Sequence, residues 1–406
     1  PASDRAEPDQ ALYRDVVEFC AFGAGLGFEA AWMLEHHFSD YFPTPSPLLL
    51  LSHIARECPD LGLGTAVLVL PWHHPLRVAE ELSMLNNLTR GRLHIGIGRG
   101  TAKLEYDAFG VDMREARGRF AEAVRVIRLA LSGEPFTFEG TYYRVPNPIT
   151  LRPTPLPEKP VRFYGAIGSP GSAAIMAEQG LPPLCLSTFP DHLLAKILGT
   201  WRARAEETGS ATAGVHLPVS IKLLVADTDA EAQALGRRYF PAYFELQCRH
   251  YEVDRNPWEG IEDYKDFSRM FANLRKLTDP DALGPYMAMN LVGSPETIRA
   301  RVAALAAVGF DYFLVGSTTQ TSYRLTGLSA ATAYTYRVEA RDNDGNRSGP
   351  ATVSFPPLAD SGSSSSCVVE YRTNDWTGGF TGTVRITNTG TSTLSSWRLA
   401  FSFPAG

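Results

Sequence analysis

Two pairs of adjacent histidines follow predicted strands, and an imidazole can serve as a base or as a hydrogen-bond donor near neutral pH. His36 and His37 come directly after the apolar run over 30–34. A pair of this kind is more often an ordinary polar cap than a catalytic group, so both interpretations stay open. His73 and His74 also follow an apolar run. Because His74 precedes a proline where a helix should begin, capping or packing is the better interpretation of this second pair.

An arginine between two glycines follows the predicted strand that begins at Leu93. The flanking glycines would let a ligand approach the backbone. Arg99 could therefore bind a phosphate or a carboxylate through its planar guanidinium group. Pairing with Glu105 or Asp107 is the alternative interpretation.

The sequence Gly-Ser-Pro-Gly-Ser over 168–172 opens a predicted helix after the strand that begins at Val161. Free backbone N–H groups at a helix start, together with the hydroxyls of Ser169 and Ser172, are a common arrangement for holding an anion. A plain N-cap would account for the same serines. The residues alone leave both interpretations open.

Helical and strand-like patterns alternate along residues 11 to 316, which predicts a parallel sheet built from βα units. The predicted strands cover 30–34, 61–70, 93–97, 161–167, 184–187, 219–226 and 312–315. The predicted helices cover 11–26, 47–56, 75–88, 115–131, 171–179, 192–207, 229–249 and 296–308.

Seven strands are one fewer than the eight of a closed βα barrel. A doubly wound sheet would place a Gly-rich turn after its first strand, whereas Gly96–Gly100 follows the third and lacks the spacing of a dinucleotide site. We therefore predict an α/β barrel. In such a barrel the reactive side chains project from the C-terminal ends of the strands, where His36, Arg99 and Ser169 are expected.

The composition excludes two classes of partner. The 406 residues include 38 Lys and Arg against 44 Asp and Glu, a formal charge of −6, and no segment concentrates positive charge for nucleic acid. The longest apolar stretches, over 48–51 and 61–70, are shorter than the roughly 20 residues of a membrane helix. Without a signal peptide, we expect the predicted barrel to be cytoplasmic.

The last 90 residues differ in composition from the rest of the chain, because 29 of them are Ser or Thr. The four earlier cysteines lack metal-ligand spacing, as in a reduced intracellular enzyme. They are Cys20, Cys58, Cys185 and Cys248. Cys367 stands alone in the final part, which suggests a disulfide whose partner is missing.

Residues 11 to 316 resemble the bacterial luciferase-like flavin-dependent monooxygenase family. The resemblance is carried by ordered motifs rather than by one pattern. They are Leu26–Phe28, Trp32–Phe38, Gly64–Pro71, His74–Arg77, Leu88–Leu93, Gly96–Gly100, Gly133–Phe136, Tyr142–Tyr143, Val292–Thr297 and Val308–Asp311. The resemblance implies a TIM (βα)8 barrel.

It also implies reduced FMN, which reacts with oxygen to give a flavin hydroperoxide that oxidises a small-molecule substrate. His36 matches the family's catalytic histidine. Arg99, Ser169 and Ser172 match its contacts to the flavin phosphate. The Ala66–Val67 bond matches a non-proline cis peptide that lies against the flavin ring. We therefore predict a cis bond there.

On the same resemblance, we expect His37, Glu105 and Tyr106 to bind substrate. A flavin reductase would supply the reduced flavin, and the chain would form a homodimer. A deazaflavin-dependent hydride transferase on the same barrel is the alternative. Gly168 and Gly98 replace an acidic residue and a reactive cysteine of the luciferases, so light emission is not expected.

Two pieces of the family pattern are missing from this chain. The first strand should precede the helix that begins near Ala11, and a final helix should follow Val315-Gly316. The first and eighth strands are neighbours in a closed barrel, so both losses fall at one seam. Open strand edges expose unpaired backbone groups. We expect the chain to be poorly soluble or inactive as written.

After the barrel, predicted to span 1–316, the sequence resembles two partial secreted modules. Residues 317–357 resemble the later strands of a fibronectin type III module, and 358–366 form a Ser-rich linker. Residues 367–406 resemble the first half of a family 2 carbohydrate-binding module. There Trp376 would stack on cellulose or chitin and Trp397 would be buried. The family's other stacking residues are absent, so we expect only weak polysaccharide contact.

The segment from Tyr239 to Met289 is rich in aromatic residues. These side chains could line or cover the substrate pocket, or they could pack an inserted helical subdomain. Both interpretations have equal support from the sequence.

Overall fold

The computed structural model describes residues 9–186, 189–210, 214–271 and 273–317, and beyond these only seven short strands. The chain divides into a larger compact unit that runs from Gln10 to Thr318 and a smaller one from Thr319 to Gly406.

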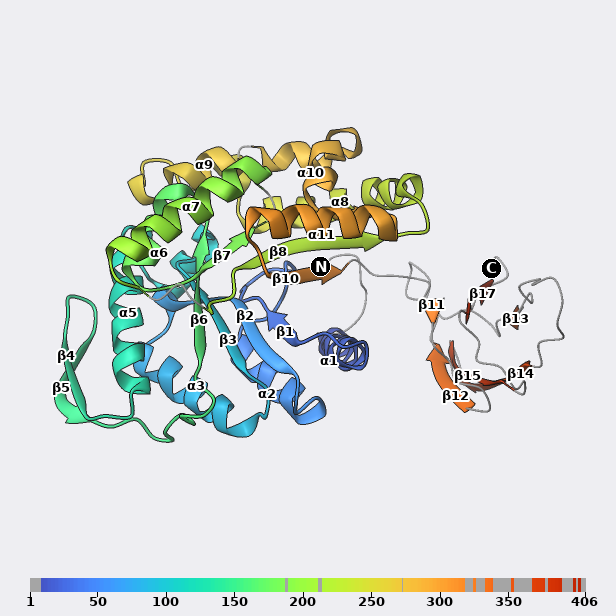
Figure 1. Ribbon diagram of the computed structural model, residues 1–406, viewed down its shortest axis with the longest axis horizontal. Coiled ribbons are helices and arrows are strands. Elements are labelled where there is room, and N and C mark those ends of the chain that lie inside the picture. The colour runs from blue at the N-terminus through green and yellow to red at the C-terminus, as the bar shows by residue number, and fades with distance from the viewer. Residues whose placement is uncertain are drawn as a thin grey trace. The chain divides into compact units, whose positions relative to one another are not determined.

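The larger unit is built on a parallel sheet in the order β1-β2-β3-β6-β7-β8-β10, with the short strand β9 paired to β8 (Figure 1). β1 and β10 are the two ends of this path, and no described pairing joins them. The bounds are β1 Ala30–Met33, β2 Gly62–Val69, β3 Leu93–Gly98, β6 Arg162–Ile167, β7 Pro183–Leu186, β8 Pro218–Val225, β9 Leu291–Gly293 and β10 Tyr312–Ser317.

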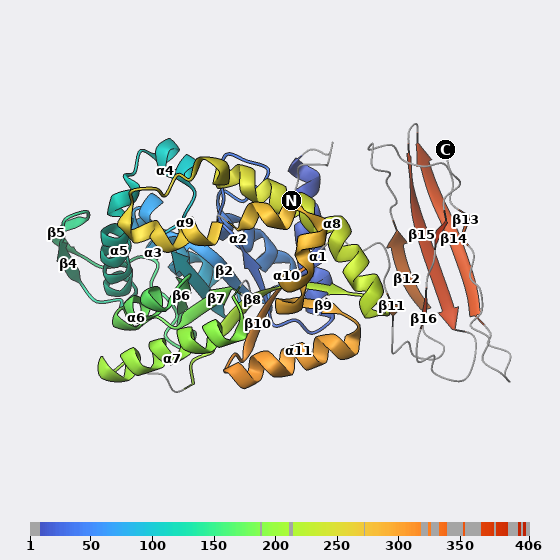
Figure 2. The ribbon, with the colours of Figure 1, turned by 90° about the horizontal axis from the view of Figure 1, so that it is seen from above.

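Helices lie around the outside of these strands (Figures 1 and 2). Their bounds are α1 Asp9–Gly25, α2 Pro47–Glu57, α3 Pro75–Leu88, α4 Lys103–Phe109, α5 Ala116–Leu131, α6 Pro170–Glu178, α7 Asp191–Glu207, α8 Asp229–His250, α9 Lys265–Phe271, α10 Gly284–Met289 and α11 Pro295–Val308. The α/β barrel predicted from the sequence is confirmed. Each predicted strand and helix is present, with ends within two residues of those expected.

The local sequence explains where these elements begin and end. All six residues of β3 are buried, as expected for a parallel strand covered on both faces. Helix α11 begins after Ser294, whose hydroxyl accepts the Thr297 N–H at 3.3 Å. It ends at Gly309, whose φ of 119° favours glycine.

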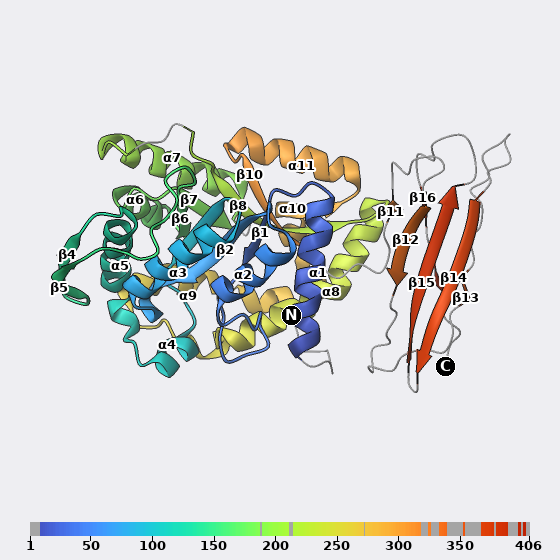
Figure 3. The same ribbon diagram turned by 90° about the horizontal axis from the view of Figure 1, so that it is seen from below.

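Elements that lack strong periodicity escaped prediction. They are α4, α9, α10, β9 and a hairpin formed by β4 (Phe136–Glu139) and β5 (Arg144–Ile149). The hairpin projects beside α5 (Figure 3). Its turn is tied to that helix by the Glu122 carboxylate, which accepts the N–H groups of Thr141, Tyr142 and Tyr143.

Large polar and aromatic side chains fill the interior where the sheet remains open. The rings of Trp32 in β1 and Tyr312 in β10 lie 6.0 Å apart. His94 stacks on both Tyr312 and Tyr164, with ring centroids 5.6 and 6.1 Å away. The two end strands are thus bridged by side chains rather than by backbone hydrogen bonds.

The aromatic segment from Tyr239 to Met289 packs against the barrel, as one of its two interpretations predicted, and its place beside the substrate stays a prediction. Trp258 and Tyr264 are buried in a cluster of their own and cover the C-terminal end of β3, where their polar groups donate to the carbonyls of Thr101 and Gly100 at 2.7 and 3.0 Å. Tyr251 lines the histidine site, with its ring 6.0 Å from that of His36.

The smaller unit is described only as backbone strands. β14 (Cys367–Trp376) and β15 (Gly379–Asn388) form an antiparallel pair, and β12 (Ala333–Val338) joins the same sheet. Short pairs link β11 (Arg324–Leu325) to β16 (Trp397–Arg398) and β13 (Thr352–Val353) to β17 (Phe401–Ser402). The side chains of Cys367, Trp376 and Trp397 lie outside the described residues, and the domain limits stay predictions.

Among the described residues, no helix combines the length and the apolar character needed to cross a membrane. The four cysteines Cys20, Cys58, Cys185 and Cys248 are buried and free, in keeping with the prediction of a reduced protein.

Leu63 in β2 is fully buried in the main core, whereas Leu49 on α2 is 73% exposed. Leu63→Ala should lower the free energy of unfolding by about 3 kcal/mol, because it removes buried methyl groups and leaves a cavity. Leu49→Ala should change it by less than about 0.5 kcal/mol. Urea unfolding followed by tryptophan fluorescence measures both, and equal effects of the two changes would contradict this account of the core.

Candidate active site

A buried carboxylate fixes the chain just beyond β1. Glu35 is 2% exposed, and one of its oxygens accepts hydrogen bonds from His37 Nε2 at 3.1 Å and His73 Nε2 at 2.6 Å. The other oxygen accepts the Val69 N–H at 2.7 Å. Glu35 therefore ties the end of β1 to the end of β2 and to the short turn of helix after it, Leu70–Trp72.

These contacts set the charge states of Glu35 and His73. Burial favours the neutral acid, but the bonds from His37, His73 and Val69 outweigh it and hold the pKa of Glu35 below its usual 4.5. Burial likewise disfavours a charged His73, but its contact with Glu35 raises the pKa of this histidine above 6.5. His74 stands at the N-cap of α3, although its side chain makes no capping hydrogen bond. The ring of His73 is held by the carboxylate that follows β1, a contact that the capping or packing prediction did not include.

A second buried carboxylate lies beside the two histidines after β1. Glu105 in α4 is 1% exposed, and its Oε1 accepts the His37 N–H at 2.7 Å. The same oxygen lies 3.5 Å from His36 Nδ1 and 3.5 Å from Nε2 of His250, the last residue of α8. We call His36, Glu105 and His250 the Glu105 cluster.

Burial controls the charge of this cluster. It lowers the pKa of His36 to about 3 and, together with the nearby His36, that of His250 to about 4. It raises the pKa of Glu105 to about 7, although His250 and His37 partly oppose this shift. Both imidazoles are thus neutral at pH 7, and each has one nitrogen that can accept a hydrogen bond.

Aromatic rings enclose the cluster. The ring centroid of His36 lies 4.9 Å from that of Tyr41 and 4.6 Å from that of His250. Tyr41 is in turn held by Gln247 Nε2, which donates to its hydroxyl at 3.0 Å. No sequence pattern pointed to His250, because it lies 211 residues from Ser39, its hydrogen-bond partner.

The peptide bond between Ala66 and Val67 is cis, as predicted. Both residues are only partly buried within β2, and the pairing with β3 shifts register at this point. A Cβ added at Gly98 would lie 2.7 Å from Val67 Cγ2, which is too close for ordinary contact. The glycine at this position, where the luciferases have cysteine, therefore fits the packing of Val67.

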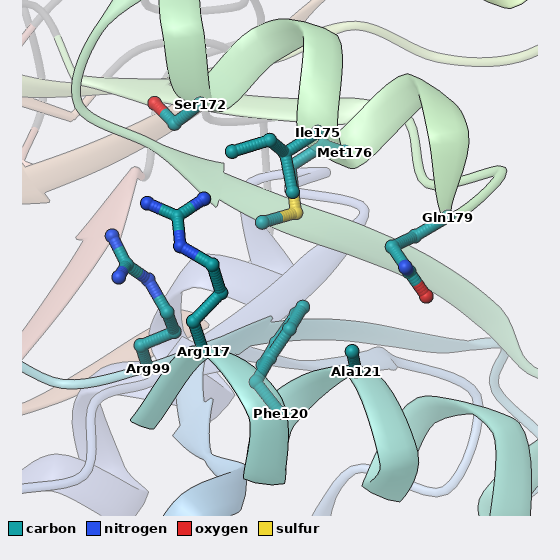
Figure 4. A pocket seen from close by; sticks show the side chains of 8 residues that line it. All are labelled: Arg99, Arg117, Phe120, Ala121, Ser172, Ile175, Met176 and Gln179. Atoms are coloured by element: carbon teal, nitrogen blue, oxygen red, sulfur yellow. The ribbon is translucent and has the colours of Figure 1, made fainter. Parts of the chain in front are cut away.

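Two arginines and the first turn of a helix line a small cleft (Figure 4). Arg99 follows β3, Arg117 lies in the first turn of α5, and both guanidinium groups point toward Ser172 on α6. Arg99 Nη1 is buried and has no hydrogen-bond partner. We call Arg99, Arg117 and Ser172 the arginine cleft.

The serines of the cleft also cap α6. The Ser169 hydroxyl accepts the Ser172 N–H at 3.3 Å, and the Ser172 hydroxyl accepts the Ser169 N–H at 2.9 Å. The N-cap interpretation is thus confirmed. This capping is compatible with the anion-binding interpretation, because Ser172 lines the cleft together with both arginines.

Arg99 does not pair with Glu105 or Asp107, so this alternative interpretation is wrong. Its guanidinium lies over the Tyr264 ring, 4.9 Å from the centroid, and Nη2 donates to the Asp263 carbonyl at 3.5 Å. Asp107 instead pairs with Lys103. Tyr106 is fully buried and donates its hydroxyl to the Arg99 carbonyl, so it positions Arg99.

The side chain of Asp263 forms an ion pair with Arg117, the second arginine of the cleft. Its carboxylate accepts Arg117 Nε at 2.7 Å, and the pair is about one-third exposed. The hydrogen bond from Arg117 lowers the pKa of Asp263, and the charges of Arg117 and Arg99 reinforce the effect. Arg117 and Asp263 escaped prediction because neither lies in a distinctive motif.

Helix α4 connects the two halves of the site. Glu105 belongs to the Glu105 cluster, and the next residue, Tyr106, holds Arg99 in the arginine cleft. The structure therefore brings His36, His37, Glu105, Tyr106 and Arg99 into one region. Trp376 belongs to the other unit.

Residues 2–312 match the model of the luciferase-like monooxygenase family, and residues 367–406 match that of the cellulose binding domain. Over 102 residues, 24% of this chain, the sequence is 49% identical to exoglucanase B of Cellulomonas fimi and covers 9% of it.

The oxygenase component of the flavin-dependent trigonelline monooxygenase of Acinetobacter baylyi is 26% identical over 74% of this chain and 82% of its own length. An F420-dependent glucose-6-phosphate dehydrogenase of Kineococcus radiotolerans is 30% identical over 58% of this chain and 72% of its own length. The chain spans only 59% and 43% of two uncharacterized relatives from Sinorhizobium fredii.

Among solved structures, the oxygenating constituent of 3,6-diketocamphane monooxygenase of Pseudomonas putida, in complex with FMN, has the same fold. Its TM-score is 0.62 at 19% identity, with 77% of this chain and 88% of that chain covered.

Glu35→Gln should lower the free energy of unfolding by about 3 kcal/mol, because it removes the negative charge that the buried partners of Glu35 contact. The contribution of Glu35 is present above pH 4.5 and is lost as the pH falls through its folded pKa. The contribution of His73 is present below pH 6.5 and is lost as the pH rises through its folded pKa. The difference between wild type and variant should therefore be largest between pH 4.5 and 6.5.

Denaturant unfolding at several pH values measures this difference. Glu80→Gln, at a half-exposed carboxylate of α3, is the matched control and should shift stability by less than about 0.5 kcal/mol. A loss of stability for Glu35→Gln that does not vary with pH would contradict the assignment.

Proposed function

Because the chain belongs to the luciferase-like monooxygenase family, we propose that it is a flavin-dependent oxidoreductase that uses reduced FMN and oxygen to oxidise a small organic substrate. The observation that carries the cofactor assignment is the arginine cleft. Two guanidinium groups and Ser172, in the first turn of a nine-residue helix, line one space, and this combination suits a phosphate. The buried, unpartnered Arg99 Nη1 is a donor that such a phosphate would satisfy.

In this proposal the chain's residues bind and orient the cofactor. Arg99 and Arg117 hold its phosphate beside Ser172. The partly exposed Ala66 and Val67 contact its ring, in line with the family resemblance. Reduced flavin, when bound, supplies two electrons to oxygen, so that one oxygen atom enters the substrate and the other leaves as water.

His36, which matches the family's catalytic histidine, serves in this proposal as a neutral hydrogen-bonding group toward the reacting atoms, since burial lowers its pKa to about 3. His37 and Glu105 fix its surroundings, and the rings of Tyr41 and Tyr251 limit the access of water. A separate flavin reductase would supply the reduced FMN.

The alternative is a deazaflavin-dependent hydride transferase on the same barrel. Its support is the F420-dependent relative at 30% identity. The arginine cleft suits the phosphate of either cofactor, so the two proposals differ in which one binds and in whether oxygen is consumed.

Anaerobic titration of the whole chain with reduced FMN and, separately, with reduced F420 tests the proposal. We expect FMN to bind more tightly by a factor of about ten or more, equivalent to about 1.4 kcal/mol. Admission of air should then lead to oxygen consumption that depends on FMN. Tighter binding of F420 without oxygen consumption would favour the alternative.

Asp263→Asn should raise the affinity for FMN by about five- to tenfold, because it removes a carboxylate that competes with the phosphate for Arg117. The neighbouring Glu262→Gln is the control and should leave the affinity within about twofold, since Glu262 is 81% exposed and pairs with Lys265. Quenching of FMN fluorescence measures all three proteins. An unchanged or weaker affinity of Asp263→Asn would contradict the competition.

His36→Asn should lower FMN-dependent turnover by a factor of about 100 or more, because the loss of one preorganised hydrogen-bonding group beside the reacting atoms costs on that scale. The affinity for FMN should stay within about threefold, since His36 lies outside the arginine cleft. Steady-state oxygen consumption and fluorescence titration separate the two effects. A variant that loses FMN affinity but keeps its turnover would contradict this role.

We also propose weak polysaccharide binding by the tail, supported by the match of residues 367–406 to the cellulose binding domain. Retention of the chain on microcrystalline cellulose tests it, with Trp376→Ala as the variant that should be released. Equal retention of the two proteins would argue against a role for Trp376.

A further inference from the structure

Three buried donor atoms converge in the Glu105 cluster. They are His36 Nδ1, a carboxylate oxygen of Glu105 and His250 Nε2, and all lie within 4.8 Å of one another. Each comes from a different part of the fold: the loop after β1, helix α4 and the end of α8. The tertiary structure alone brings them together.

Neither nitrogen has a hydrogen-bond partner, although both atoms are buried. Their distance of 3.5 Å from the Glu105 oxygen is too long for a good hydrogen bond. His250 is only 1% exposed, so bulk solvent does not reach its ring. Buried polar atoms without partners cost free energy, and a ligand that binds all three atoms would remove this cost.

Residues around the cluster orient its donor atoms. Ser39 Oγ lies 2.7 Å from His250 Nδ1. When Nδ1 donates to this hydroxyl, the lone pair of Nε2 points into the cluster. The His37 N–H donates to the Glu105 oxygen at 2.7 Å. Such outer hydrogen bonds are typical of metal sites, where they fix the tautomer of a histidine and the direction of a carboxylate.

We propose that His36, Glu105 and His250 bind a divalent transition-metal ion of the zinc type. Two imidazoles and one carboxylate form a known ligand set for such ions, with further positions left for water or substrate. Tetrahedral coordination at zinc–ligand distances of about 2.0–2.1 Å places neighbouring donors about 3.3–3.5 Å apart. The two separations of 3.5 Å from Glu105 match this spacing. The two imidazole nitrogens lie within 4.8 Å of each other, so a bound ion would draw these two rings closer together.

The inference does not depend on the proposed flavin chemistry, but it shares His36 with it. An ion at this site would occupy His36 Nδ1, so that this nitrogen could no longer accept a hydrogen bond. Metal binding and the proposed role of His36 should therefore compete.

Titration of the metal-stripped whole chain with Co²⁺ tests the site, because four- or five-coordinate Co²⁺ absorbs visible light much more strongly than the hydrated ion. We expect one equivalent to bind and Zn²⁺ to displace it. His250→Gln and Glu105→Gln should each abolish the absorption or weaken binding by a factor of about ten or more. Ser39→Ala, which removes only the orienting hydroxyl, should weaken it by about tenfold.

His53→Gln, at an exposed histidine of α2, is the control and should bind Co²⁺ like wild type. Circular dichroism of each variant shows whether it has folded. Absence of the cobalt absorption in the wild-type chain would overturn the proposal, as would equal binding by wild type and both ligand variants. FMN titration of the same samples keeps the two proposals apart, because a failure of one leaves the other result unchanged.

Discussion

The geometry of the candidate site depends on one buried carboxylate. Glu35 follows β1, accepts hydrogen bonds from His37, His73 and the backbone of Val69, and so fixes the ends of β1 and β2 relative to each other. His36 lies between Glu35 and His37, so these bonds fix the backbone on either side of it, and its ring packs against Tyr41 and His250. A carboxylate this deeply buried is stable only because three donors offset the cost of desolvation.

From this fixed point the site extends through α4. Its Glu105 accepts the N–H of His37, and its Tyr106 donates to the carbonyl of Arg99. The histidine region and the arginine cleft are therefore linked by adjacent residues of one short helix. A change that shifts α4 would therefore move the histidine region and the arginine cleft together. Neither link depends on backbone pairing between the end strands β1 and β10. The rings of Trp32 and Tyr312 bridge that opening from within.

Much of the fold could be predicted from the sequence, because strands such as β3 and helices such as α3 follow periodic patterns set by burial. The residues after each strand could be identified for the same reason, and His36, Arg99 and Ser169 do follow the C-terminal ends of β1, β3 and β6. His250, Arg117 and Asp263 could not be predicted. They reach the site through long-range packing, 211 residues apart in the case of His250 and Ser39, and nothing in their local sequence marks them. The contact of His73 with Glu35 could not be predicted, because the two residues follow different strands.

The central claim is that the arginine cleft binds the phosphate of a flavin. Calorimetric titration of the same preparation with FMN and with riboflavin tests it most directly, because the two ligands differ only in that phosphate. Two charge-assisted contacts of about 1.5–3 kcal/mol each predict that FMN binds at least about 100-fold more tightly. Equal affinities for the two flavins would contradict the account.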